Sequence, residues 1–341
     1  MSLQSGATLP DRLPGHTGGR PVHAPSKTPQ KIGQAMSFRT LLAAGAALLL
    51  AGQAASAKDL KSVGISVGSL GNPYFISMVN SVKREAHKIN PSAAVNAVSS
   101  DYDLGKQSNQ MDNFIASGVD LILLAAADPN AIAASVKRAE AAGIVVIAVD
   151  VEAAGADATV QTDNLAAGRV SCAYLADKID DKGNVIIQNG PQVSSIIARV
   201  KGCKESLAGH PHIKILSDNQ NGLVSREGGL NVMSGDLTRF PDIQAVFTVD
   251  DPQAIGANLA ASQLHRSDFI ITSVDGAPDI VNALKSKTLI QASASQDPAE
   301  EGKRGVDIGY GLMNGKTPAQ KVTLLAPTLV TRDNVGQYKG W

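Results

Sequence analysis

The stretch Ser62-Val63-Gly64-Ile65-Ser66-Val67 decides the fold, together with the amphipathic segment from Phe75 to about Ile89 that follows it. A short β-branched run followed by apolar residues at helical spacing predicts one βα unit. The same alternation continues as far as Val149, which predicts an open parallel sheet with helical crossovers. Its further strands are expected at residues 94–98, 121–124 and 145–149, and its further helices at residues 106–117 and 131–142.

A second series of the same kind follows the stretch Asp157–Asp163. Strands are expected at residues 185–188, 213–216, 245–249, 269–274 and 289–292, and helices at residues 165–178, 195–207, 227–238, 252–264 and 278–285. The continuous apolar run Leu121–Leu124 is typical of a strand that helices cover on both faces of its sheet. The sequence therefore predicts an α/β protein with two doubly wound parallel-sheet lobes.

The segment before these series has a different composition. Residues 1–35 are rich in Pro, Gly, His, Thr and Ser without apolar periodicity, so we expect a disordered upstream segment or a mis-start. Residues 36–57 combine a basic start, an apolar run and Ala55-Ser56-Ala57, which is typical of a secretory signal peptide cleaved after Ala57. The alternative is a membrane anchor, but the run Leu41–Ala51 is shorter than the roughly 20 residues that a spanning helix needs. We expect a periplasmic protein, and N-terminal sequencing of exported material that began before Lys58 would contradict this.

The charge balance indicates which partners to expect. Lys plus Arg and Asp plus Glu number 31 each, and aromatic residues make up 4% of the chain, so the basic surface of a nucleic-acid-binding protein is not expected. The histidines of the mature chain fit surface positions better than metal ligation, and we expect no metal and no cofactor: His87, His210, His212 and His265. A neutral solute is the better partner.

Two cysteines, Cys172 and Cys203, are the only ones in the chain. In an exported protein they can form a disulfide that closes a loop of about 30 residues and contributes about 3 to 4 kcal/mol. The alternative is two unrelated buried thiols.

Two motifs match enzyme signatures in residue type, but their positions or spacing do not fit. Gly64-Ile65-Ser66-Val67-Gly68 matches a hydrolase nucleophile elbow, but Ser66 lies inside the expected strand instead of on a sharp turn. The segment Gly311–Thr317 resembles a phosphate loop, but its spacing fails and it ends a helix instead of opening one. No dinucleotide fingerprint follows the first strand either, so we do not expect an enzyme.

Acidic residues follow several expected strands, at the edge of a parallel sheet where ligands bind. For Asp128 and Asp251, each before a proline, we favour helix capping, whereas for Asp150 and Asp275 we favour ligand contact. Carboxylates accept hydroxyl protons in strong charge-assisted bonds, so such a cleft suits a polyhydroxylated ligand. The adjacent Tyr74 and Phe75 supply rings for sugar C–H faces, although packing of the helix that begins at Pro73 is the alternative role.

These residues together resemble the ribose-binding-protein-like periplasmic sugar-binding proteins of ABC importers, periplasmic binding protein type 1. The motifs that carry the resemblance are Gly71–Phe75, Val149-Asp150, Gly229–Met233, Ala245–Phe247, Asp275–Asp279 and Gln296 before Asp297-Pro298. The resemblance covers residues 58–330 and implies two lobes joined by a three-segment hinge, with the chain crossing near residues 161, 296 and 326. It implies an N-terminal lobe of residues 58–161 plus 297–325 and a C-terminal lobe of residues 162–296 plus 326–341.

The resemblance also implies which residues bind the ligand. The implied set is Asn72, Tyr74 and Phe75 from the first lobe, Asp150 and Gln296 beside the hinge, and Asp250 and Asp275 from the second lobe, with Arg199 as a substitute for a missing arginine. The ribose-type pattern has a hydroxyl residue at Gly68, Arg at Val151, Arg near Ile197 and Asn at Asp250. Because of these departures we expect a different pentose, a hexose or a sugar alcohol, and we expect these four positions to select it.

The implied function is the solute-binding component of an ABC importer, a monomer that delivers its ligand to a membrane permease by hinge closure. A periplasmic sensor that presents a sugar to a chemoreceptor or sensor kinase is the alternative, and genetic linkage to either system would separate the two. Repressors share this ligand-binding core, but the chain lacks a DNA-binding helix-turn-helix ahead of it.

Overall fold

A computed structural model describes residues 57–341, so the predictions for residues 1–56 lie outside the described part of the chain. Its strands form two six-stranded sheets with the same internal order. The first sheet has the order β2-β1-β3-β4-β5-β11 and the second has the order β7-β6-β8-β9-β10-β12. All pairs of neighbouring strands are parallel except β10 and β12. The predicted fold class is therefore confirmed.

The first sheet and the helices packed on it come mainly from the N-terminal half of the described chain. The elements are β1 (Ser62–Val67), α2 (Pro73–Ile89), β2 (Ala94–Ser99), α3 (Leu104–Ala116), β3 (Leu121–Leu124), α4 (Ala133–Ala141), β4 (Val145–Val149), β5 (Ala158–Thr162), α10 (Pro298–Met313) and β11 (Val322–Leu325). Helix α10 returns from the far end of the sequence to pack on α2 and on the sheet.

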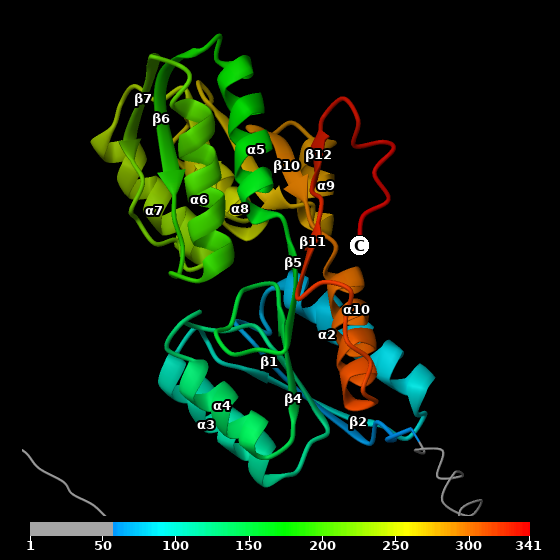
Figure 1. Cartoon of the computed structure of the whole chain (residues 1–341). Coiled ribbons are helices and arrows are strands. Elements are labelled where there is room, and N and C mark those ends of the chain that lie inside the picture. Colours follow the sequence, from blue (N-terminus) through cyan, green and yellow to red (C-terminus); the bar gives the residue numbers. More distant parts are fainter. Residues whose placement is uncertain (1–56) are drawn as a thin grey trace, which may run out of the picture. The chain divides into compact units, whose positions relative to one another are not determined.

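The second sheet and its helices take up most of the remaining chain. The elements are α5 (Asn164–Lys178), β6 (Lys182–Gln188), α6 (Ser194–Leu207), β7 (His212–Ser217), α7 (Arg226–Arg239), β8 (Ala245–Thr248), α8 (Asp251–Gln263), β9 (Ile270–Asp275), α9 (Pro278–Leu284), β10 (Ile290–Ser295) and β12 (Thr328–Thr331). Three segments pass between the two sheets: β5 to α5, β10 to α10, and β11 to β12 (Figure 1). These three connections correspond to the three-segment hinge that the resemblance implied.

Helix packing buries the central strands. All four residues of β3 are fully buried, as expected for a strand that helices cover on both faces. Ser66 lies within β1 and donates a hydrogen bond to Gln110 at 2.8 Å. A hydrolase nucleophile needs a sharp turn after the strand, so the position of Ser66 does not match that motif. None of the helices within residues 57–341 is long and apolar enough to cross a membrane.

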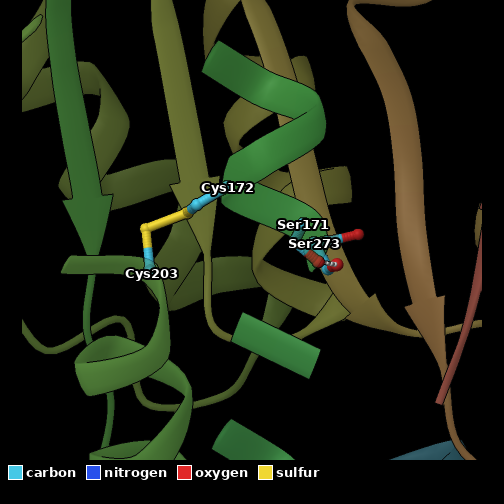
Figure 2. The surroundings of a disulfide bond; sticks show 4 residues. All are labelled: Ser171, Cys172, Cys203 and Ser273. Atoms are coloured by element: carbon cyan, nitrogen blue, oxygen red, sulfur yellow. Dashed lines mark hydrogen bonds between the residues drawn. A yellow bond between two sulfur atoms is a disulfide. The ribbon is translucent and has the colours of Figure 1, made fainter. Parts of the chain in front are cut away.

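Helices α5 and α6 cross unusually closely, and a disulfide joins them. A Cβ on Gly168 would lie against the carbonyl oxygen of Arg199, and one on Gly202 would lie against that of Leu165, so only glycine permits this approach. Cys172 and Cys203 form the predicted disulfide at the same crossing, with their Cα atoms 5.0 Å apart (Figure 2). Ser171 donates a hydrogen bond to the Ser273 carbonyl at 2.9 Å, which ties α5 to β9.

The structure differs from the sequence predictions mainly at the sheet edges. The stretch Asp157–Asp163, which separated the two predicted series, contains strand β5. Strands β11 and β12 near the C-terminal end of the chain were not predicted, and β12 pairs antiparallel with β10. Their sequences mix threonine or glutamine with apolar residues, unlike the continuous apolar run of β3.

Candidate functional site

A small cavity gathers residues from both sheets. Its lining consists of Asn72, Tyr74, Phe75, Tyr102, Asp150, Val193, Ser195, Ile196, Arg199, Val224, Asp250, Asp275 and Gln296. Most of these residues follow the carboxyl end of a strand, which is where ligands bind in doubly wound sheets. All eight ligand-contact residues that the resemblance implied are in this set.

The N-terminus of α2 contributes the first group. Asn72 caps the helix by accepting a hydrogen bond from the Tyr74 backbone N–H at 2.9 Å through its Oδ1. Its side-chain amide therefore remains as a possible donor to the cavity. Tyr74 and Phe75 are both buried and pack edge to face, with ring centroids 5.2 Å apart. The rings pack the helix and also line the cavity, while their contact with a sugar stays a prediction.

Arg199 on α6 is the central cation of the site. It donates through Nε to Asn164 Oδ1 at 2.8 Å and through a terminal nitrogen to the Val249 carbonyl at 2.8 Å. The same nitrogen lies 3.5 Å from Asp275 Oδ1. That carboxylate oxygen also accepts a hydrogen bond from Gln296 Nε2 at 2.7 Å. These contacts fix Arg199, Asp275 and Gln296 relative to one another.

Asp250 combines a place in the cavity with the capping role that was expected of its neighbour Asp251. Asp250, and not Asp251, is the N-cap of α8, where its Oδ1 accepts from the Gln253 backbone N–H at 3.1 Å. Its other oxygen, Oδ2, is buried without a hydrogen-bond partner. Asp251 lies inside the helix and accepts from Ser273, Ser293 and the Ala277 backbone N–H. The capping prediction for Asp251 was therefore wrong, because the helix begins one residue earlier than the proline indicated.

The predicted capping role of Asp128 takes a different form. Its Oδ1 accepts from the backbone N–H groups of Asn130 and Ala131 at 2.9 and 2.8 Å, whereas helix α4 has Ile132 at its N-cap. Asp128 thus stabilises the turn ahead of the helix.

Several lining residues have a left-handed backbone. Among the residues of the cavity, φ is +58° at Tyr102, +65° at Asp150, +44° at Val224 and +139° at Asp275. Such conformations cost free energy for residues other than glycine, and they concentrate at functional sites. For a β-branched residue such as Val224 the cost is higher still. Their concentration around one cavity marks it as the candidate site.

Burial raises the pKa of the carboxyl groups in the cavity. It raises the pKa of Asp150 and of Asp275 to about 6, although the charge of Arg199 opposes the shift. Burial, followed by the negative charge of Asp275, raises the pKa of Asp250 well above its usual range. The site therefore holds more acidic groups than its single arginine balances.

Behind Tyr74 lies a buried carboxyl group that the sequence reading missed. Glu301 on α10 is fully buried and accepts hydrogen bonds from the Tyr74 hydroxyl and from Thr162 Oγ1, both at 2.8 Å. Burial raises the pKa of Glu301 to about 8, and the charge of Asp150 adds to the shift. Thr162 ends β5, so Glu301 joins the cavity to two of the segments that pass between the sheets.

Three of the four positions expected to select the ligand do not line the cavity. Gly68 lies beneath the ring of Tyr102, which occupies the space where a Cβ would stand. Val151 is buried away from the lining, and the side chain of Ile197 is exposed on α6. Asp250 is the one of the four that lines the cavity. The ribose-type pattern has an arginine near Ile197, and in this chain Arg199, half a helical turn further along α6, places a guanidinium in the cavity.

Some of the site residues that were not predicted could have been found from the sequence. Tyr102 comes three residues after the end of β2, so the rule that selected the strand-end aspartates also applies to it. Glu301 is a charged residue four positions before Gly305 on the buried face of α10, where an apolar residue is expected. Val193, Ser195, Ile196 and Val224 follow β6 and β7 without a distinctive residue type.

A larger groove of about 1120 Å³ lies next to the cavity and shares Asn72, Tyr102 and Val224 with it. The cavity itself measures about 30 Å³, far below the roughly 300 to 1,000 Å³ typical of ligand pockets. Next to lining residues of the cavity, the Glu152 backbone N–H donates a hydrogen bond to Ser194 Oγ at 2.7 Å. The two lobes therefore touch beside the cavity in the described conformation.

The fold and the cavity together define a class, the two-lobed α/β solute-binding proteins. The chain belongs to the periplasmic binding protein family, because the family profile described as periplasmic binding protein domain matches residues 63–317.

Relatives with named ligands support this assignment. The ribose import binding protein of Bacillus subtilis is 30% identical over 268 residues, which is 78% of this chain and 85% of the relative. The xylitol-binding protein of Mycolicibacterium smegmatis is 29% identical over 290 residues, 84% of this chain and 81% of the relative.

A solved structure agrees with the fold. The periplasmic solute-binding protein of an ABC transporter from Actinobacillus succinogenes, with bound D-allose, is 27% identical with a TM-score of 0.74. The match covers 82% of this chain and 100% of that protein. These relatives are named as binding proteins and not as enzymes.

Proposed function

We propose that this protein is the periplasmic solute-binding component of an ABC importer, and that it binds a monosaccharide or sugar alcohol between its lobes for delivery to a membrane permease. The observation that carries the proposal is the cavity between the two sheets, with carboxylates, amides, one guanidinium and two adjacent aromatic rings. The relatives bind ribose, xylitol and D-allose according to their names, which are ligands of this chemical kind.

The hydrogen-bonding groups in the cavity favour a ligand rich in hydroxyl groups. Asp250 Oδ2 and Gln296 Oε1 are buried acceptors without partners, and Asp150 offers a further carboxylate. Each buried acceptor left unpaired costs about 1–3 kcal/mol, and hydroxyl donors of a ligand would remove that cost. The rings of Tyr74 and Phe75 would cover an apolar C–H face.

The same unpaired groups give a reason for hinge motion. Without a ligand, closing the lobes buries the acceptors unpaired, so an open form that leaves them in water is favoured. A ligand held by one lobe adds its hydrogen bonds to the second lobe only on closure, and that difference in free energy populates the closed form. The cavity of about 30 Å³ requires such opening before a sugar can enter.

Calorimetric titration of residues 58–341 with a panel of pentoses, hexoses and sugar alcohols tests the proposal. We expect at least one to bind, and Asp150→Asn to weaken that binding about 10- to 100-fold, because a charge-assisted bond is worth about 1.5–3 kcal/mol. Asp177→Asn, on the exposed end of α5, is the matched control and should bind like the parent. Binding of no panel member, or full affinity in Asp150→Asn, would refute the proposal.

A further inference from the structure

The charges around the cavity do not balance. Five buried carboxyl groups line it or contact residues that line it: Asp150, Asp250, Asp251, Asp275 and Glu301. Among residues 57–341, Arg199 is the only buried arginine or lysine. The N-terminus of α8 adds about half a positive charge beside Asp250 and Asp251. Acidic groups therefore outnumber the basic groups that could pair with them.

The excess is greatest at Asp250. Asp275 has both Arg199 and Gln296 as partners, and Glu301 has two hydroxyl partners. Asp250 has only the capping bond to its Oδ1, while its Oδ2 is buried without a partner. A buried charge without a partner is strongly unfavourable, so a ligand that supplies a cation there gains more than one that supplies a hydroxyl.

A metal ion does not suit this arrangement. Within residues 57–341, no three histidine, cysteine or acidic side chains are placed to hold one. An ammonium group fits better, because it has three donors and no acceptor and so pairs with carboxylate and amide oxygens without competing for donors. Asp250 Oδ2 and Gln296 Oε1 are the unpaired acceptors of this cavity.

We infer that the solute carries a protonated amine, as in an amino sugar or an amino polyol, and that the amine pairs with Asp250. The inference rests on the proposed function and narrows its ligand class. Arg199 holds Asp275 and leaves Asp250 to the ligand, so the hydroxyl groups of the same ligand are bound by Asp150, Asp275 and Asn72.

Matched pairs of ligands test this inference, with residues 58–341 titrated by calorimetry at neutral pH. Each pair has one skeleton with either a hydroxyl or an amino group, such as glucose with glucosamine and galactose with galactosamine, extended to inositols and pentitols. We expect the amino member of the best-bound pair to bind about tenfold tighter or more, since one desolvated ion pair is worth at least about 1.4 kcal/mol.

Asp250→Asn provides the decisive variant, because asparagine keeps the capping oxygen of α8 while it removes the charge. We expect it to lose the preference for the amino ligand and to keep its thermal stability, whereas Asp177→Asn should keep the preference. Equal or tighter binding of the neutral members would overturn the inference and leave the proposed function standing. An amino preference that survives in Asp250→Asn would also overturn it, and binding of neither member in any pair would overturn both.

Discussion

The ring of Tyr102 occupies the space above Gly68, where the ribose-type pattern has a hydroxyl side chain. The ring lies so close to Gly68 that any Cβ there would displace it. Tyr102 in turn adopts a left-handed backbone and lines the cavity. Gly68 and Tyr102 therefore depend on each other: the missing side chain of Gly68 makes room for the ring of Tyr102, which follows the neighbouring strand β2.

This pairing predicts the effect of Gly68→Ser. The added side chain should push the Tyr102 ring out of the cavity and weaken ligand binding about tenfold, with a smaller effect on stability because the far end of a side chain can move. In a Tyr102→Ala background the same change should have little effect. Calorimetry on the double-mutant cycle measures the coupling, and additive losses would show that the two positions act independently.

Glu301 predicts how the stability of the unliganded protein depends on pH. Its pKa is raised to about 8 from an ordinary 4.5, so between these values the folded state holds a proton that the unfolded state has released. That contribution to stability is complete below about pH 4.5 and is lost as the pH rises through 8. The free energy of unfolding should therefore fall with rising pH, by up to about 1.4 kcal/mol per pH unit for one proton.

The variant Glu301→Gln removes this titration, so the free energy of unfolding should fall less steeply above pH 6, where Asp150 and Asp275 have passed their pKa of about 6. Besides Asp150, the groups that act on Glu301 are Tyr74, Thr162 and Arg199, which the variant leaves in place. Glu300→Gln is the control, because Glu300 is the neighbouring carboxyl on α10 and is half-buried, paired with Arg304 outside the cavity. Chemical denaturation across pH 6 to 8 measures the slopes, and a slope in Glu301→Gln equal to that of the parent would contradict the assignment.

At the scale of elements, the crossing of α5 and α6 positions the only buried arginine. Arg199 lies one helical turn before Cys203, and Gly168 and Gly202 allow the helices to meet closely enough for its hydrogen bond to Asn164. The disulfide thus stabilises the helix pair that carries Arg199.

Replacing both cysteines, Cys172→Ala with Cys203→Ala, should lower the free energy of unfolding by about 3 to 4 kcal/mol, the loop-closure value for a separation of 31 residues. Urea denaturation of the parent with and without reductant should show the same difference, and reductant should not affect the double variant. Equal stability of the oxidised parent and the double variant would contradict a stabilising role.

Most central elements could be predicted from the sequence because their patterns are local. The runs Ser62–Val67 and Leu121–Leu124 are apolar and β-branched, and both are buried strands in the structure. Strands β11 and β12 could not be predicted in this way, since they are half exposed and their pairing depends on segments far away in sequence.

In the candidate site, too, the residues with a local sequence signal were predicted and those that depend on long-range contacts were not. Asp150 and Asp275 stand directly at strand ends, so the general rule for parallel sheets found them. The Tyr74–Glu301 hydrogen bond joins residues 227 positions apart, and no local pattern encodes it. The filling of the space above Gly68 by Tyr102 likewise depends on how two strands lie side by side.

At the scale of the whole molecule, Trp341 contacts both sides of the site. Its indole N–H donates to the Asp275 carbonyl at 2.8 Å, and its ring packs edge to face against Tyr74 with centroids 6.1 Å apart. Asp275 ends a strand of the second sheet, whereas Tyr74 lies on α2 beside the first. Because the chain contains one tryptophan, its fluorescence reports on this junction.

We expect the emission of Trp341 to shift to shorter wavelength as ligand closes the lobes and removes water from the indole. Trp341→Phe should lose the signal while calorimetry still detects binding. Emission that stays constant through a titration in which calorimetry records saturation would show that the junction does not move.

Small-angle X-ray scattering of residues 58–341, with and without a saturating ligand from the calorimetric panel, tests most directly whether solute binding closes two lobes. We expect a smaller radius of gyration for the liganded protein, and in Asp150→Asn the same decrease only at higher ligand concentration. An unchanged radius of gyration at saturation would contradict ligand-driven closure.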